Sequence, residues 1–151
     1  MVILKKSVAG LTERSMQRFL SLACRTAGLQ GTVNVLVSSN RELRALNRRF
    51  RGKNQATDVL SFPALPGPKN SHAGDIAISV EIAGHHARRL GHKTAQEVKI
   101  LILHGVLHLQ GFDHERDRGE MARREQKLRR ALRLPSGLIE RTQSECWRRR
   151  A

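Results

Sequence analysis

Three histidines close together in the sequence have the residue type and the spacing of a metal site. His104 and His108 are four residues apart, so an α-helix would project both imidazoles from the same face, and His114 follows six residues later. Three neutral imidazole ligands with an open fourth position are typical of a catalytic rather than a structural zinc. The spacing therefore predicts one Zn²⁺ per chain, held by His104, His108 and His114.

The same spacing occurs in zinc proteases, which gives the main competing interpretation. Those enzymes carry a glutamate directly after the first histidine, where it acts as the general base. This chain has Gly105 at that position, and glycine has no side chain that can take a proton. The sequence therefore disfavours a metzincin-like metalloprotease that lacks its glutamate.

The first two histidines are predicted to lie on a buried central helix over residues 94–109. This stretch is apolar on almost every side, which is typical of a helix surrounded by the core. Thr94 and Glu97 have the spacing of a capping box at its start. After its end, Gly111 can take a left-handed conformation, which would turn the chain back towards His114.

The rest of the pattern predicts an α+β fold, a small mixed β-sheet packed against several helices. Strands are expected over residues 2–8, 32–38 and 74–80, with a further short apolar strand that Pro63 ends. Helices are expected over residues 12–27, 40–50, 81–90 and 115–133. Thr12 and Asn40 are the expected N-caps of the first two helices. We expect a single zinc-dependent domain over residues 1–137, followed by a basic, weakly ordered tail over residues 138–151.

Charge and composition indicate the class of partner. The chain has 28 Lys and Arg against 13 Asp and Glu, a formal net charge of +15, which attracts polyanions such as nucleic acid. No apolar run reaches the ~18 residues of a membrane span, and no secretory signal is apparent. The two cysteines, Cys24 and Cys146, form no disulfide framework. We therefore expect a cytoplasmic protein; the sequence leaves its oligomeric state open.

Three stretches together resemble the YbeY family of bacterial endoribonucleases. The first comprises Leu46 to Arg51 with Gly52-Lys53, and Thr57-Asp58-Val59-Leu60-Ser61-Phe62-Pro63. The second runs from Gly74 to Ser79, and the third from His104 to His114. The resemblance implies a single-strand-specific, zinc-dependent endoribonuclease. It further implies a role in maturation of the 3′ end of small-subunit (16S) rRNA and in ribosome quality control, with precursor rRNA and the small ribosomal subunit as partners.

The resemblance also implies roles for individual residues. His104, His108 and His114 match the family's metal ligands, and Arg51 matches its functional arginine. A fixed guanidinium can stabilise the charge that develops on phosphoryl oxygens, so Arg51 is the predicted catalytic side chain. Whether the nucleophile is zinc-bound water or the ribose 2′-hydroxyl stays open.

Other candidate residues surround this predicted centre. Asp113 either orients a ligand imidazole or caps the following helix, and Asp58 is a candidate for shaping the pocket. Arg48, Arg49 and Lys53 are predicted to contact RNA. The competing hypothesis of another class is a non-catalytic RNA- or ribosome-binding factor with a structural zinc.

Overall fold

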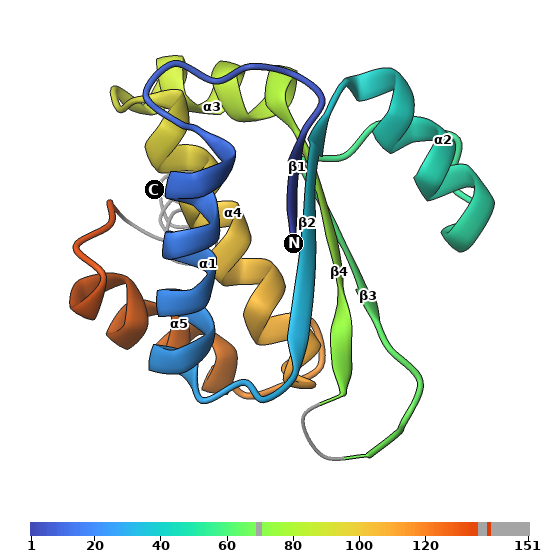
Figure 1. The fold of residues 1–151 in the computed structure, drawn as a ribbon, viewed down its shortest axis with the longest axis vertical. Coiled ribbons are helices and arrows are strands. Elements are labelled where there is room, and N and C mark those ends of the chain that lie inside the picture. Colours follow the sequence, from blue (N-terminus) through green and yellow to red (C-terminus); the bar gives the residue numbers. More distant parts are fainter. Residues whose placement is uncertain (69–70, 136–138, 140–151) are drawn as a thin grey trace, which may run out of the picture.

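A computed structural model of the chain describes residues 1–68, 71–135 and 139. In chain order the elements are β1 (Val2–Leu4), α1 (Glu13–Ala27), β2 (Thr32–Ser38), α2 (Asn40–Arg51), β3 (Val59–Pro63), β4 (His72–Ser79), α3 (Val80–Leu90), α4 (Thr94–Leu109) and α5 (Glu120–Ala131). Figure 1 shows the sheet edge-on, with α2 by itself on one side and the other helices on the opposite side. The predicted α+β class is confirmed.

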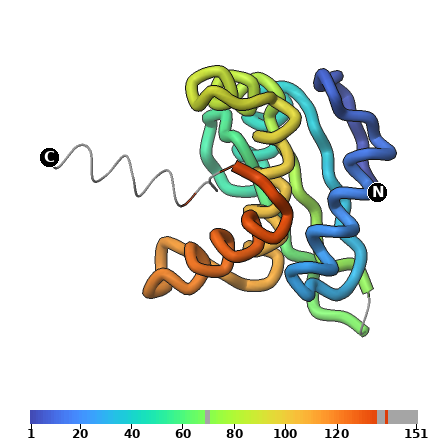
Figure 2. Tube along the Cα trace, turned by 90° about the vertical axis from the view of Figure 1, so that its left-hand side faces the viewer, coloured from blue at the N-terminus to red at the C-terminus, as the bar shows by residue number. Residues whose placement is uncertain are grey.

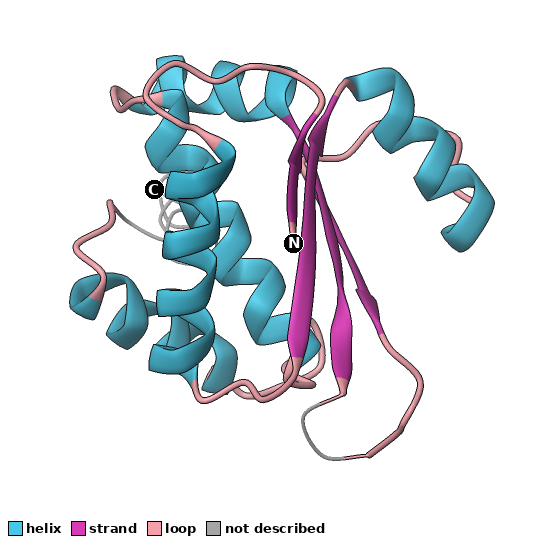
Figure 3. Cartoon of the chain, in the orientation of Figure 1, coloured by secondary structure: helices cyan, strands magenta, loops and turns pink. Residues whose placement is uncertain are grey.

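The sheet has four strands in the order β1-β2-β4-β3. The strands β1, β2 and β4 run parallel, and β3 pairs antiparallel with β4, so the sheet is mixed and β3 lies at one edge. Figure 3 shows this single strand layer in magenta between the helices. The edge strand β3 has only 5 residues and ends at Pro63, and both features limit edge-to-edge association.

Alternation along the strands divides the core between the two faces of the sheet. Val35 and Val37 of β2 lie beside Ile76 and Ile78 of β4, and all four join the large cluster that includes α1 and α4. The neighbouring Ala77 points to the other face. There it joins a smaller cluster under α2, completed by buried Leu43 and Leu60.

The central helix α4 is buried as predicted. Its side chains from Val98 to Leu107 are buried apart from Lys99, and the helix contacts β3, β4, α1, α3 and α5. Figure 2 shows α5, in orange and red, running beside the same half of α4 that carries the histidines. Because α4 is enclosed in this way, the positions of its side chains are fixed by the whole core.

The ends of several elements differ from the sequence prediction. Thr12 caps α1 as expected, but Ser39, and not Asn40, caps α2 by accepting a hydrogen bond from Glu42 N–H. Lys93, and not Thr94, precedes α4, and its N–H donates to Gln96. The larger shifts affect β1, which stops at residue 4, β4, which starts at residue 72, and α5, which starts at residue 120 because turns and bends fill residues 114–119.

Part of the predicted C-terminal tail can be assessed. Ile139 belongs to the described residues and is 6% exposed, packed in the large core cluster. This residue is therefore part of the packed core. The remainder of the segment 138–151 lies outside the described residues. Of the helices within them, none combines the length and hydropathy needed to cross a membrane.

Candidate metal centre

The three predicted ligands come together at the C-terminal end of α4. His104 and His108 occupy its last two turns, Gly111 turns the chain with φ +96°, and His114 returns to the same point. One ring nitrogen from each histidine lies within 4.8 Å of the others. His104 is buried, His108 is half-buried and His114 is exposed, so the cluster has a protein side and a solvent side, as an open fourth position requires.

Hydrogen bonds fix which nitrogen of each helical histidine faces the centre. His104 Nδ1 lies 2.8 Å from Glu125 Oε2, and His108 Nδ1 lies 3.0 Å from the carbonyl oxygen of Phe112. A carboxylate and a carbonyl can only accept, so each Nδ1 carries a hydrogen, and each ring in its neutral form presents a bare Nε2 lone pair.

The two bare nitrogens point at each other. His104 Nε2 and His108 Nε2 are 3.1 Å apart, a distance at which two unprotonated nitrogens repel. A cation between or beside them removes that repulsion, and a metal ion can take both lone pairs at once. The donor set and its orientation therefore fit a zinc-type ion.

The electrostatics of the cluster keep His108 in the form that binds metal. Burial lowers the pKa of His108, and the neighbouring His104 and His114 lower it further, while the Phe112 carbonyl and Asp113 act in the opposite direction. A neutral imidazole near neutral pH is the species that ligates a cation.

Glu125 was not predicted from the sequence, although it makes the closest polar contact to a ligand ring. It is 1% exposed, and besides His104 it accepts a hydrogen bond from Ile139 N–H at 2.9 Å. Glu125 lies on the same buried side of α5 as Met121 and Leu128. A glutamate within an otherwise apolar helix stripe is the sequence signal that could have identified it.

The structure gives a packing reason for Gly105, the residue that counts against the protease interpretation. A Cβ built at Gly105 would lie 2.8 Å from Ile76 Cδ1 and 3.0 Å from Ile76 Cγ2. This position of α4 faces the central strand β4, so a glutamate would collide with the core. The protein therefore has neither the side chain nor the space for a metalloprotease base.

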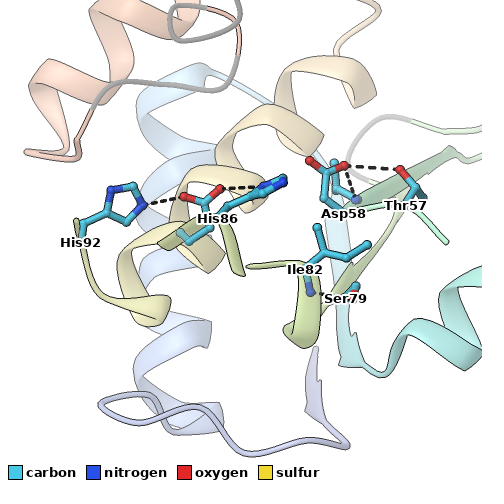
Figure 4. Close-up of polar contacts among 8 residues, drawn as sticks. Thr57, Asp58, Ser79, Ile82, His86 and His92 are labelled. Atoms are coloured by element: carbon cyan, nitrogen blue, oxygen red, sulfur yellow. Dashed lines mark hydrogen bonds and ion pairs between the residues drawn. The ribbon is translucent and has the colours of Figure 1, made fainter. Parts of the chain in front are cut away.

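The two predicted acidic neighbours of the site hold local backbone. Asp113 Oδ1 accepts a hydrogen bond from Glu115 N–H at 3.1 Å, and its other oxygen lies 3.5 Å from Arg116 Nε. Asp58 Oδ1 accepts from Val59 N–H at 2.8 Å and from Thr57 Oγ1 at 3.4 Å (Figure 4). Across the described residues, no hydrogen bond joins either carboxylate to the three histidines.

Glu97 has a different role from the predicted helix cap. It is fully buried, with Oε2 2.6 Å from His92 Nε2 and Oε1 3.7 Å from His86 Nδ1, the two histidines labelled in Figure 4. His86 and His92 are both only partly exposed. This carboxylate joins the loop before α4 to α3.

The predicted arginine and lysine sites lie on or directly after α2. Arg51 is the last residue of that helix, and Arg48, Arg49, Arg51 and Lys53 are all exposed. Their helix covers the face of the sheet opposite α4 (Figure 1). Within the described part of the chain no hydrogen bond or ion pair links Arg51 to the histidines.

Comparison with known proteins agrees with this geometry. A family model described as Endoribonuclease YbeY matches residues 4–133. The chain is 59% identical to the Endoribonuclease YbeY of Koribacter versatilis over 142 residues, covering 94% of this chain and 91% of that protein. It is 47% identical to the Endoribonuclease YbeY of Solibacter usitatus over 143 residues, covering 95% of each.

The fold is also similar to a solved structure. The solution structure of a Thermotoga maritima protein aligns with a TM-score of 0.59 at 28% identity, covering 85% of this chain and 86% of that one. The region matched by the family model contains the strands β2, β3 and β4, the buried helix α4 and the three histidines. The chain belongs to the YbeY family of endoribonucleases.

Proposed function

We propose that this endoribonuclease is zinc-dependent, cuts single-stranded RNA, and acts in the cytoplasm on the 3′ end of precursor small-subunit rRNA and in ribosome quality control. The observation that carries the metal part is the pair of bare Nε2 atoms 3.1 Å apart, completed by a third histidine. The relatives' endoribonuclease activity and the +15 charge support RNA as the substrate.

The protein's part in the reaction is to present three oriented imidazoles. Glu125 and the Phe112 carbonyl hold the Nδ1 hydrogens of His104 and His108, so both Nε2 atoms face the same point. His114, on the solvent side, leaves that point accessible to a phosphodiester. A zinc ion held there would supply a Lewis acid, which offsets charge on a phosphoryl oxygen and lowers the pKa of water.

Arg51 is proposed to stabilise charge on the phosphate that is cut. It is exposed at the end of α2, and a planar guanidinium can donate two parallel hydrogen bonds to phosphoryl oxygens. Because α2 lies on the opposite face of the sheet from α4, an RNA strand that meets both Arg51 and the histidines must pass the edge of the sheet formed by β3.

The proposal is tested by measuring metal content and cleavage together. Wild-type protein should contain about one zinc per chain and cut a single-stranded RNA, and chelation should stop the cleavage. His104→Ala, His108→Ala and His114→Ala should each lose stoichiometric zinc, because two imidazoles make a weak site. Elemental analysis of the purified proteins reports this directly.

Two results would contradict the proposal in different ways. Near-wild-type zinc in one of the three variants would remove that histidine from the ligand set. Wild-type protein that binds RNA without cutting it, with binding that survives loss of the histidines, would instead indicate a non-catalytic RNA-binding factor.

A further inference from the structure

The exposed side of α2 carries a concentration of positive charge that the metal centre does not explain. Arg41, Arg44, Arg48 and Arg49 line an open depression of about 510 Å³ together with Ala45 and Asn54. The four arginines are exposed, and in the described part of the chain none forms an ion pair with a carboxylate. Their charge is therefore available to a ligand.

The acidic residue of this helix does not neutralise the arginines. Glu42 is bonded to Lys5 Nζ at 2.8 Å and to the Ser38 hydroxyl. Arg44 is instead held by a neutral group, since its Nε donates to Asn54 Oδ1 at 2.8 Å. That hydrogen bond orients the guanidinium without reducing its charge.

An exposed aromatic ring adjoins the arginines. Phe50 is 58% exposed, its ring centroid lies 5.3 Å from that of Phe62, and the Arg49 guanidinium carbon lies 5.2 Å from its centre. Phe62 is partly buried against the smaller core cluster, so Phe50 is supported from below. A supported ring beside unpaired guanidiniums is the combination on which single-stranded nucleic acids stack their bases and rest their phosphates.

We propose that the exposed side of α2 is a second RNA-contact surface, which binds phosphates through Arg41, Arg44 and Arg48 and stacks a base on Phe50. This inference rests on the proposed function, since it assumes an RNA substrate. The surface lies across the sheet from the histidines. The edge strand β3 lies between the two helices, since it packs against α2 on one face and against α4 on the other. The surface would therefore contact RNA beyond the phosphate that the histidines and Arg51 hold.

The charge contribution is tested with the zinc-loaded protein and a short 2′-O-methyl oligouridine, whose integrity is checked on a gel. The triple variant R41Q/R44Q/R48Q should bind about tenfold or more weakly. Its plot of log affinity against log salt should be shallower by about 0.7 for each phosphate that the variant no longer neutralises. Bound zinc and the thermal unfolding midpoint serve as controls for an intact protein.

A matched variant shows whether the affinity depends on where the arginines lie or only on the net charge of the protein. R14Q/R18Q/R25Q removes the same number of charges from exposed positions on α1, on the other side of the sheet. It should keep wild-type affinity and salt slope. An equally large drop in affinity for both triple variants, or unchanged affinity in the α2 variant, would overturn the proposal.

The aromatic contribution distinguishes RNA from an acidic protein partner. Phe50→Ala should weaken oligouridine binding about fivefold or more, because it removes the ring on which a base stacks, but leave binding of polyglutamate unchanged. Equal affinity of Phe50→Ala and wild type for oligouridine would assign this surface to an acidic partner and overturn the proposal. Failure of the proposed function would instead be seen in the wild-type protein, which would then fail to hold zinc or fail to cut RNA.

Discussion

At the scale of residues, the metal centre depends on which nitrogen each imidazole presents. The ligand spacing alone brings His104 and His108 onto one side of α4, but the tautomers are decided by Glu125 and by the Phe112 carbonyl. These acceptors come from α5 and from the turn after α4, so the ligands are oriented by parts of the chain that follow them. A ligand set without such partners would hold metal more weakly.

Glu125→Gln tests this orientation. The amide has one acceptor oxygen in place of two, so it cannot serve both His104 Nδ1–H and Ile139 N–H. We expect zinc affinity to fall by about 10- to 100-fold while the chain stays folded. Competition with a chelator measures the affinity, and an unchanged dissociation constant would show that Glu125 has only a packing role.

Arg51→Lys tests the proposed contact with the phosphate. Lysine keeps the charge but not the two-pronged donor geometry, so turnover should fall about tenfold or more, with zinc content and thermal midpoint unchanged. Steady-state cleavage of a single-stranded RNA gives the comparison. Equal turnover in the two proteins would identify Arg51 as a solvated residue at the helix end.

At the scale of elements, the site depends on how closely α4 approaches the sheet. The absence of a side chain at Gly105 lets the helix rest on Ile76, one residue from the first ligand. Ile76 is 1% exposed in the central part of the sheet and is stiff at χ1, so it cannot move aside easily. The distance between α4 and β4 is therefore fixed next to His104, the first of the three ligands.

Gly105→Ala should destabilise the protein although alanine is the better helix former. Helix propensity contributes about 1 kcal/mol in favour of alanine, whereas overpacking against Ile76 costs about 1–3 kcal/mol. In an Ile76→Ala background the obstacle is gone, so the same substitution should become stabilising. Urea unfolding of the four proteins measures both effects, and the same sign in both backgrounds would refute the packing explanation.

At the scale of the whole molecule, the C-terminal segment contributes to the metal centre. Ile139 is buried in the main core, and its N–H reaches the carboxylate that orients His104. Ile139 and His104 are far apart in the sequence, yet two hydrogen bonds to the Glu125 carboxylate connect them. Loss of this segment should therefore affect both stability and metal binding.

Deleting residues 138–151 is expected to lower the free energy of unfolding by about 3 kcal/mol, because it removes the burial of Ile139 and a hydrogen bond to a charged group. Zinc affinity should fall as well. Ile139→Ala in the full-length chain keeps the backbone N–H, so it should lose stability while zinc affinity changes less. Urea unfolding and chelator competition give the two readouts, and a truncated chain that matches wild type in both would contradict the connection.

The sequence by itself determined the features that depend on local spacing. The ligands four residues apart on an apolar helix, the glycine that turns the chain towards His114, and most of the strands and helices follow from periodicity and caps, which are local properties of the chain. The strand order and the pairing of Glu97 with His92 could not be predicted in this way. They depend on contacts formed after folding.

Only the tertiary structure decided what surrounds the candidate site. It placed Glu125 on His104, put Gly105 against Ile76, included Ile139 in the core, and set α2 with its arginines on the opposite face of the sheet from the histidines. Each of these contacts and placements depends on residues that are far apart in the sequence. The physical reason is that packing and hydrogen bonding depend on distance in space, and a single sequence fixes that distance only through the complete fold.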